Sequence, residues 1–136
     1  MKLHHVGVIV PAIEPALEHY RAVLQMEPTT AAVYDPIQDA KLIMIEPPGG
    51  GPGIELIEPA SPASPVAKQA GGGGGLAHVC YEVDDIEAEV ARQRQAGALT
   101  VQAPVPAVLF GGRRVAFLYL RTKHLIEMVE ADSDGS

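Results

Sequence analysis

The chain has 136 residues, enough for one domain with its own hydrophobic core. Hydrophobic residues make up 47% and charged residues 20%, and the formal net charge of −7 argues against the basic surface that nucleic-acid binding normally requires. Apolar runs reach about six residues, against roughly 20 needed to cross a bilayer, and a lone Cys80 leaves no internal disulfide. We therefore expect a cytoplasmic protein that binds neither nucleic acid nor membrane.

The first predicted strand, 5–10, has two chemically different faces. Successive side chains of a strand point to opposite faces, so the valines of VGVIV share one face while His5, Gly7 and Ile9 share the other. Apolar residues then recur at helical spacing over 13–25, with a proline in the first turn. We expect this helix to cover the valine face. Strands are predicted at 41–46 and 53–58.

The middle of the chain reads as a linker. Ser64 and Pro65 resemble the cap and first residue of one short helix, and five glycines at 71–75 predict a mobile tether. A strand through Val79, Tyr81 and Val83 follows, then a helix over 85–95 that is stopped by Ala96-Gly97. Further strands are predicted at 99–104, 113–120 and 124–130.

The sequence contains an internal repeat. LHHVGVIVPAIE at 3–14 matches LAHVCYEVDDIE at 76–87 with an offset of 73, and IELIE at 54–58 matches IEMVE at 126–130 with an offset of 72. The prediction is an α+β fold of two tandem βαβββ modules within a single domain, 1–131. Module one covers 1–60, the linker 61–75, module two 76–131, and a polar tail 132–136.

The repeat also selects four candidate ligands. Each module has one sheet face without a helix, so two modules would form a curved mixed sheet around a shared concave cup. His5 and His78 point to this face, and Glu55 and Glu127 lie on strands at matching places in the two halves. Two imidazoles and two carboxylates suit Zn, Ni, Co, Mn or Fe(II). A single strand histidine or glutamate is more often structural or solvent-facing; the equivalent positions in both halves favour the metal interpretation.

Neighbouring polar residues are predicted to lie elsewhere. His4 has the opposite parity to His5, and Glu58 and Glu130 have the wrong parity relative to the candidate ligands. Cys80 shares the parity of His78, but a small core thiol is the favoured interpretation. His19 and His124 are expected on the surface, and His124 is close enough to the site to remain an open candidate.

The sequence resembles the vicinal oxygen chelate superfamily, which includes glyoxalase I, methylmalonyl-CoA epimerase, extradiol dioxygenases and the fosfomycin and bleomycin resistance proteins. The resemblance covers about 3–130 and is strongest to the methylmalonyl-CoA epimerases. It rests on HHVGVIV (4–10), IELIEP (54–59), SPVAKQAGGGGGLAHVCYEVDDIEA (64–88) and FGGRRVAFLYLRTKHLIEMVE (110–130). It implies the same four metal ligands, His5, Glu55, His78 and Glu127.

The chain departs from both enzyme patterns. Glyoxalase I usually has a glutathione-binding arginine four residues after its first ligand, where this chain has Ile9, and an Asp-Pro-Asp/Asn-Gly turn where this chain has Leu-Arg-Thr-Lys-His. The epimerases usually have His-Pro-Lys where this chain has Tyr119-Leu120-Arg121. A second, non-ligand base proposed for some epimerases would fall near the apolar Leu42.

The predicted activity is proton transfer alpha to a carbonyl through a metal-stabilised enolate, as in a methylmalonyl-CoA epimerase, with Glu127 and Glu55 as the acid/base pair. One alternative is a lactoylglutathione lyase of the glyoxalase I type, or another metal-dependent enzyme of this superfamily. Another is a binding or resistance protein without catalysis.

The expected substrate is a CoA thioester. Its anionic groups could contact one or more of four basic residues, Arg113, Arg114, Arg121 and Lys123, or the N-terminus of the short linker helix. For any single one of the four, a solvated charge at a strand end is the favoured interpretation. The expected assembly is a homodimer. The sequence leaves open whether the modules pair within a chain or across the dimer.

Overall fold

The computed structural model describes residues 1–132 of the chain. They form two compact units, which are described separately. The first unit is His5–Ala77, and the second combines Met1–His4 with the chain from His78 onward. None of the helices among the described residues is long and apolar enough to cross a membrane.

The first unit is a sheet with helix α1 against it and the short helix α2 after its last strand. Its strands follow the order β2-β4-β5-β1, with β3 also paired to β4. β1 runs parallel to β5, and β4 runs antiparallel to β5, so the unit has the predicted βαβββ connection with one additional short strand. The elements are β1 (Lys2–Ile9), α1 (Ile13–Leu24), β2 (Glu27–Pro28), β3 (Val33–Asp35), β4 (Ala40–Glu46) and β5 (Gly53–Pro59).

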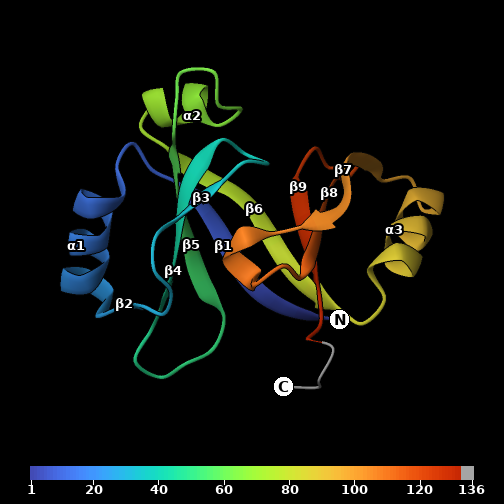
Figure 1. The fold of residues 1–136 in the computed structure, drawn as a ribbon, viewed down its shortest axis with the longest axis horizontal. Coiled ribbons are helices and arrows are strands. Elements are labelled where there is room, and N and C mark those ends of the chain that lie inside the picture. Colours follow the sequence, from blue (N-terminus) through green and yellow to red (C-terminus); the bar gives the residue numbers. More distant parts are fainter. Residues whose placement is uncertain (133–136) are drawn as a thin grey trace. The chain divides into compact units, whose positions relative to one another are not determined.

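Helix α1 covers the face of the sheet that the sequence predicts. Figure 1 shows α1 alongside β4 and β5. Val8 and Val10 pack with Ile13, Leu17 and residues of β4 and β5 in one apolar cluster. The N-cap residue of the helix is Ala12, whose side chain makes no capping hydrogen bond, and the Ile13 N–H instead donates to Glu58 Oε1 at 2.7 Å. A residue at the end of β5 therefore caps α1.

The second unit repeats this arrangement. Its strands follow the order β6-β9-β8-β7, with β6 parallel to β9 and β8 antiparallel to β9. Asp85 caps α3 by accepting a hydrogen bond from the Ala88 N–H, and α3 packs over a core that includes Val83, Ile86 and Met128. The elements are β6 (Gly75–Val83), α3 (Ile86–Gln95), β7 (Leu99–Pro106), the 3₁₀ turn η1 (Val108–Phe110), β8 (Arg114–Tyr119) and β9 (Leu125–Glu130).

The predicted elements agree with the structure to within one or two residues at most ends. The helices predicted at 13–25 and 85–95 are found at Ile13–Leu24 and Ile86–Gln95. The strand predicted at 99–104 continues to Pro106, and its pairing with β8 shifts register twice. The α+β fold with a βαβββ connection in each half is confirmed. Of the predicted polar tail, residues 133–136 lie outside the described residues.

The linker differs from its prediction in two ways. Ser64 does not cap the short helix, because α2 (Ala67–Gly71) begins after Val66 and the Ser64 hydroxyl donates to the Gln38 carbonyl at 2.7 Å. The glycine run is a defined turn instead of a loose tether. The Gly74 N–H donates to the Gln69 carbonyl, and a Cβ on Gly74 would lie 2.2 Å from the Ile9 carbonyl oxygen. Only glycine permits this close approach, since the φ of Gly74 is +89°.

Candidate metal-binding residues

The first unit brings together His5 and Glu55. β1 and β5 are parallel, and Gly7 of β1 is the direct partner of Glu55. His5 is two residues before Gly7 on β1, so its side chain lies on the same face of the sheet as that of Glu55. Both residues are buried, with exposed surface fractions of 0% for His5 and 1% for Glu55. His5 Nε2 lies 3.8 Å from Glu55 Oε2. On the other side of Glu55, Met44 of β4 is its direct partner.

The second unit brings together His78 and Glu127 in the equivalent way. Cys80 of β6 is opposite Glu127, and His78 Nε2 lies 3.1 Å from Glu127 Oε1. Both residues are buried. Phe117 of β8 is the other direct partner of Glu127, and its ring meets the His78 ring edge-on, with centroids 5.5 Å apart and an interplanar angle of 82°.

The chemistry of these two pairs fits a divalent metal. A carboxylate taken out of water is costly unless a cation, a hydrogen-bond donor or a metal compensates its charge. Each unit contains a buried glutamate with an imidazole against it, and these nitrogen and oxygen donors are the ligands that first-row divalent metals prefer. The four residues predicted from the repeat thus occur as two matching buried pairs.

The neighbouring polar residues have structural contacts, as their parity predicts. The His4 ring meets the Phe110 ring edge-on at 5.3 Å. Glu58 caps α1 and also lies 3.6 Å from the Lys41 ammonium. Glu130, its equivalent in the second unit, accepts hydrogen bonds from the Arg114 backbone and guanidinium. Cys80 is fully buried.

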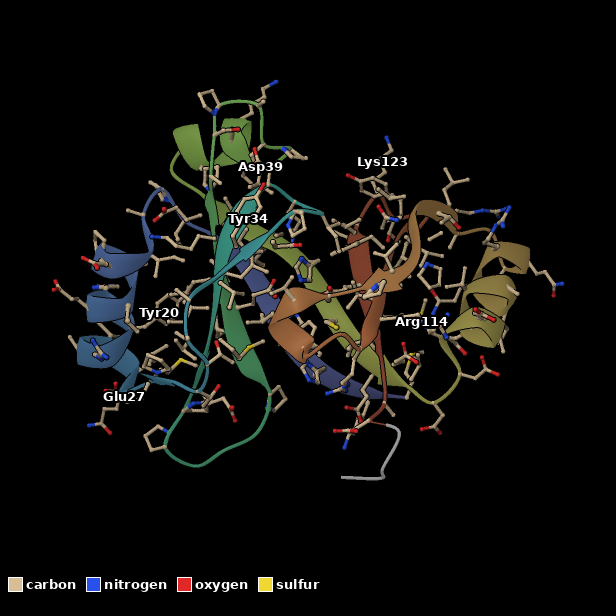
Figure 2. The ribbon with its side chains drawn as sticks, in the orientation of Figure 1. Tyr20, Glu27, Tyr34, Asp39, Arg114 and Lys123 are labelled. Atoms are coloured by element: carbon tan, nitrogen blue, oxygen red, sulfur yellow. The ribbon has the colours of Figure 1, made fainter. Side chains whose placement is uncertain are left out.

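Two of the four basic residues predicted as anion contacts are held within the second unit. Arg113 donates to Glu82 Oε2 and to the Glu130 carbonyl, at 3.0 and 2.9 Å. Arg114, labelled in Figure 2, bridges Glu87 and Glu130, and hydrogen bonds to these two carboxylates raise the pKa of its guanidinium. The linker helix α2 has five residues and begins at Ala67, later than expected, and the anion contact at its N-terminus stays a prediction.

Phe117 is the residue beside the candidate ligands that the sequence patterns did not indicate. It lies 73 residues after Met44, so the repeat offset places both at the same position in their units. Aligning the complete β4 and β8 segments, and not only the ends of each half, would have shown that the direct partners of the two glutamates differ.

The fold and the sequence define the class of protein. The family model of the glyoxalase/bleomycin resistance protein/dioxygenase superfamily matches residues 4–117, and the chain belongs to this superfamily. Because the match spans both units, the resemblance predicted from the repeat and its flanking motifs is confirmed.

Particular relatives narrow the similarity. The chain is 35% identical over 120 residues to the ethylmalonyl-CoA/methylmalonyl-CoA epimerase of Cereibacter sphaeroides, covering 87% of each chain. Among solved structures it is similar to a hypothetical protein from Bacillus halodurans, with 32% identity, a TM-score of 0.85 and coverage of 97% and 95% of the two chains. It is also similar to methylmalonyl-CoA epimerase from Mycobacterium tuberculosis, with 26% identity, a TM-score of 0.85 and coverage of 98% and 89%. These similarities support an epimerase-like function.

Proposed function

We propose that this protein is an epimerase of a malonyl-type CoA thioester, most similar in activity to methylmalonyl-CoA epimerase. The observation that carries the proposal is the occurrence of one buried His–Glu pair in each unit, in a chain 35% identical to an epimerase with that substrate. Epimerisation requires removal of the alpha proton from one face of a carbon and its return to the other face. Two carboxylates at equivalent positions provide one acid/base group for each face.

We further propose that His5, Glu55, His78 and Glu127 are the ligands of one divalent metal ion, with Co, Ni, Zn, Mn and Fe as candidates. Such an ion would supply Lewis-acid polarisation of the thioester carbonyl and so increase the acidity of the alpha proton. The chain's own residues supply the rest. The histidines hold fixed positions on β1 and β6, and the glutamates accept and return the proton.

The carboxylates are suited to this task by their surroundings. Both are buried, so they exchange protons away from bulk water, and each is fixed by a strand on either side. A general base held by a packed sheet needs little reorganisation when the substrate binds. No second non-ligand carboxylate is required in this scheme, which agrees with the apolar Leu42 at the position where such a base would fall.

The test is hydrogen–deuterium exchange at the alpha carbon of methylmalonyl-CoA in D₂O, followed by NMR or mass spectrometry on metal-loaded protein. We expect exchange with the natural chain, and a fall of about 100-fold or more in Glu127→Gln and Glu55→Gln, since general acid–base catalysis contributes about 10²–10⁴-fold. Glu18→Gln is the matched control, because Glu18 is exposed on α1.

Absence of exchange with the metal-loaded natural chain would reject the epimerase. Turnover of the hemithioacetal of methylglyoxal and glutathione would instead favour a glyoxalase-type lyase. Binding of a small molecule without turnover of either substrate would favour the non-catalytic alternative.

A further inference from the structure

The second unit contains a pocket on the helix-covered side of its sheet. The pocket has a volume of about 380 Å³ and lies where the end of α3 meets β6 and the turn between β8 and β9. Its walls include Tyr81, Gln93, Ala98, Leu120, Arg121 and Ile126. Ile126 belongs to the core beneath α3, and Ala98 and Leu120 pack against that core.

This pocket is separate from the His78–Glu127 pair. Ile126 and Glu127 are consecutive residues of β9, so their side chains point to opposite faces of the sheet. The candidate ligands lie on the face of the sheet opposite α3, and the pocket lies on the face that α3 covers. A molecule in the pocket therefore does not occupy the proposed metal site.

Arg121 gives the pocket a positive charge that the described residues do not neutralise. Arg113 and Arg114 are paired with carboxylates, and Arg92, which also lines the pocket, forms an ion pair with Glu89. Arg121 has no such carboxylate within residues 1–132. Its guanidinium lies against Gly97, where an added Cβ would come within 2.5 Å of Arg121 Nε. The missing side chain at Gly97 thus leaves room for the Arg121 guanidinium.

Most of the carbonyl groups at the end of α3 accept hydrogen bonds from the backbone that follows the helix. The carbonyls of Arg92, Gln93 and Arg94 accept hydrogen bonds from the N–H groups of Ala96, Ala98 and Gly97, respectively. The turn that closes the helix therefore satisfies three of the last four helical carbonyl groups, and Arg121 adds a positive charge to this side of the pocket.

Gln93 supplies a polar group on the helix side. It is only 7% exposed, and its Nε2 donates to Glu89 Oε1 at 3.2 Å and lies 3.0 Å from Met128 Sδ. The hydrogen bond to Glu89 fixes the orientation of the amide, because a carboxylate accepts from NH₂ and repels the amide oxygen. Within the described residues, Gln93 Oε1 has no hydrogen-bond partner, and as an acceptor it cannot bind a carboxylate, so that role falls to Arg121.

We propose that this pocket binds a small carboxylate with a short apolar chain. The apolar residues accommodate the chain, and the Arg121 guanidinium binds the carboxylate through paired N–H donors. The charge of Arg121 favours an anion, and the apolar walls favour one that carries an apolar chain. This binding site goes beyond the proposed epimerase reaction and does not depend on it.

The experiment is a titration of the full chain with sodium hexanoate, followed by isothermal calorimetry and by backbone amide NMR. We expect saturable one-to-one binding with shifts in α3, β9 and the β8–β9 turn. Arg121→Gln should weaken binding by at least about tenfold, as expected for loss of a charged hydrogen bond. Lys123→Gln, a change in the same exposed turn at a residue that does not line the pocket, should leave the affinity unchanged.

Hexanamide and inorganic phosphate identify the chemistry that is recognised. Hexanamide keeps the chain without the charge and should bind at least about tenfold more weakly, and phosphate alone should not saturate the site. Equal affinities for hexanoate and hexanamide, an unchanged affinity in Arg121→Gln, or no saturable binding of hexanoate would each overturn the proposal. All of these readouts are independent of epimerase activity and of metal.

Discussion

Phe117 and Met44 occupy equivalent positions beside the two candidate carboxylate ligands, and they give the two pairs different surroundings. Phe117 is the direct partner of Glu127 and meets the His78 ring edge-on. Met44 is the direct partner of Glu55, and its unbranched thioether adapts to its neighbours without fixing them. The edge-on contact with Phe117 therefore restrains the His78 ring.

Replacing Phe117 tests this difference. Phe117→Leu should lower the free energy of unfolding by about 1–2 kcal/mol and broaden the NMR signals of the His78 ring, because the edge-on contact is lost. Met44→Leu is the control and should cost less than about 1.5 kcal/mol without changing the His78 signals. An unaltered His78 ring in Phe117→Leu would show that Phe117 only fills space.

A second residue-scale feature is the group of exposed hydrogen bonds around Asp39. Figure 2 shows Tyr34 and Asp39 next to each other, where the Tyr34 hydroxyl donates to Asp39 Oδ1 at 2.8 Å. The Ser61 hydroxyl donates to the other carboxylate oxygen. The hydrogen bond from Ser61, and to a lesser extent that from Tyr34, lowers the pKa of the Asp39 carboxyl below its ordinary value of 3.8. They join the β3–β4 turn to the chain after β5.

The lowered pKa sets the direction of a pH effect. A carboxyl whose pKa is lower in the folded state stabilises the fold above its unfolded pKa, and this contribution is lost as the pH falls through the folded value. Ser61→Ala should therefore be less stable than the natural chain at pH 7, and the difference should narrow below about pH 4.

Urea unfolding of the natural chain and of Ser61→Ala between pH 7 and pH 3 measures this difference. Thr100→Ala, which removes an exposed hydroxyl on β7, is the control and should shift stability by the same amount at every pH. A difference for Ser61→Ala that grows on acidification would contradict the assignment.

At the scale of elements, the glycine run 71–75 is the segment whose structure is most demanding. Gly73, Gly74 and Gly75 all have positive φ, and Gly74 approaches the β1 backbone at Ile9. Gly72 differs, with a φ of −87° and no atom closer than 3.6 Å to an added Cβ. The run therefore contains one position, Gly74, that requires glycine, and another, Gly72, that tolerates a side chain.

Two alanine substitutions separate these positions. Gly74→Ala should destabilise the protein by about 2–4 kcal/mol, through an unfavourable φ and a clash with the Ile9 carbonyl. Gly72→Ala should change the free energy of unfolding by less than about 1 kcal/mol, because its backbone conformation is open to alanine. Thermal and urea unfolding of the two variants provide the measurement, and equal losses would mean that the run has no specific approach to β1.

The elements also show what the sequence could and could not predict. The end of α3 was located well because its stop, Ala96-Gly97, follows the helix directly in the sequence. The cap of α1 comes from Glu58, 45 residues away, and the partner of the Ser64 hydroxyl is 26 residues away. Local patterns do not contain such contacts. For the same reason the ion pairs of Arg113 and Arg114 were missed, whereas the candidate ligands were found because the repeat places them at equivalent positions.

At the scale of the whole molecule, duplication is the main principle of construction. The two units share the parallel pairing of their first and last strands, the helix on one face and the buried His–Glu pair on the other. If both pairs hold one ion, as we propose, metal binding depends on both halves of the chain. If each pair held its own ion, the halves would bind independently.

Metal stoichiometry distinguishes these cases. After treatment with EDTA and reloading with Co(II) or Zn(II), we expect one ion per chain by elemental analysis and a rise in the melting temperature. His5→Ala and His78→Ala should each abolish tight binding, because either change removes one of four shared ligands. His19→Ala is the control, since His19 is exposed on α1. Two ions per chain, or one retained by each variant, would refute a shared site.

The burial of Cys80 has a consequence for following the protein's motions. It is the chain's lone cysteine, it is 0% exposed, and it lies on β6 in register with Glu127 of β9. A thiol reagent reaches such a sulfur only after the surrounding structure opens, so the rate of labelling reports how often that opening occurs. The natural sequence thus contains its own probe of local opening beside one candidate ligand pair. Slower labelling on addition of metal would show that the ion closes this part of the sheet.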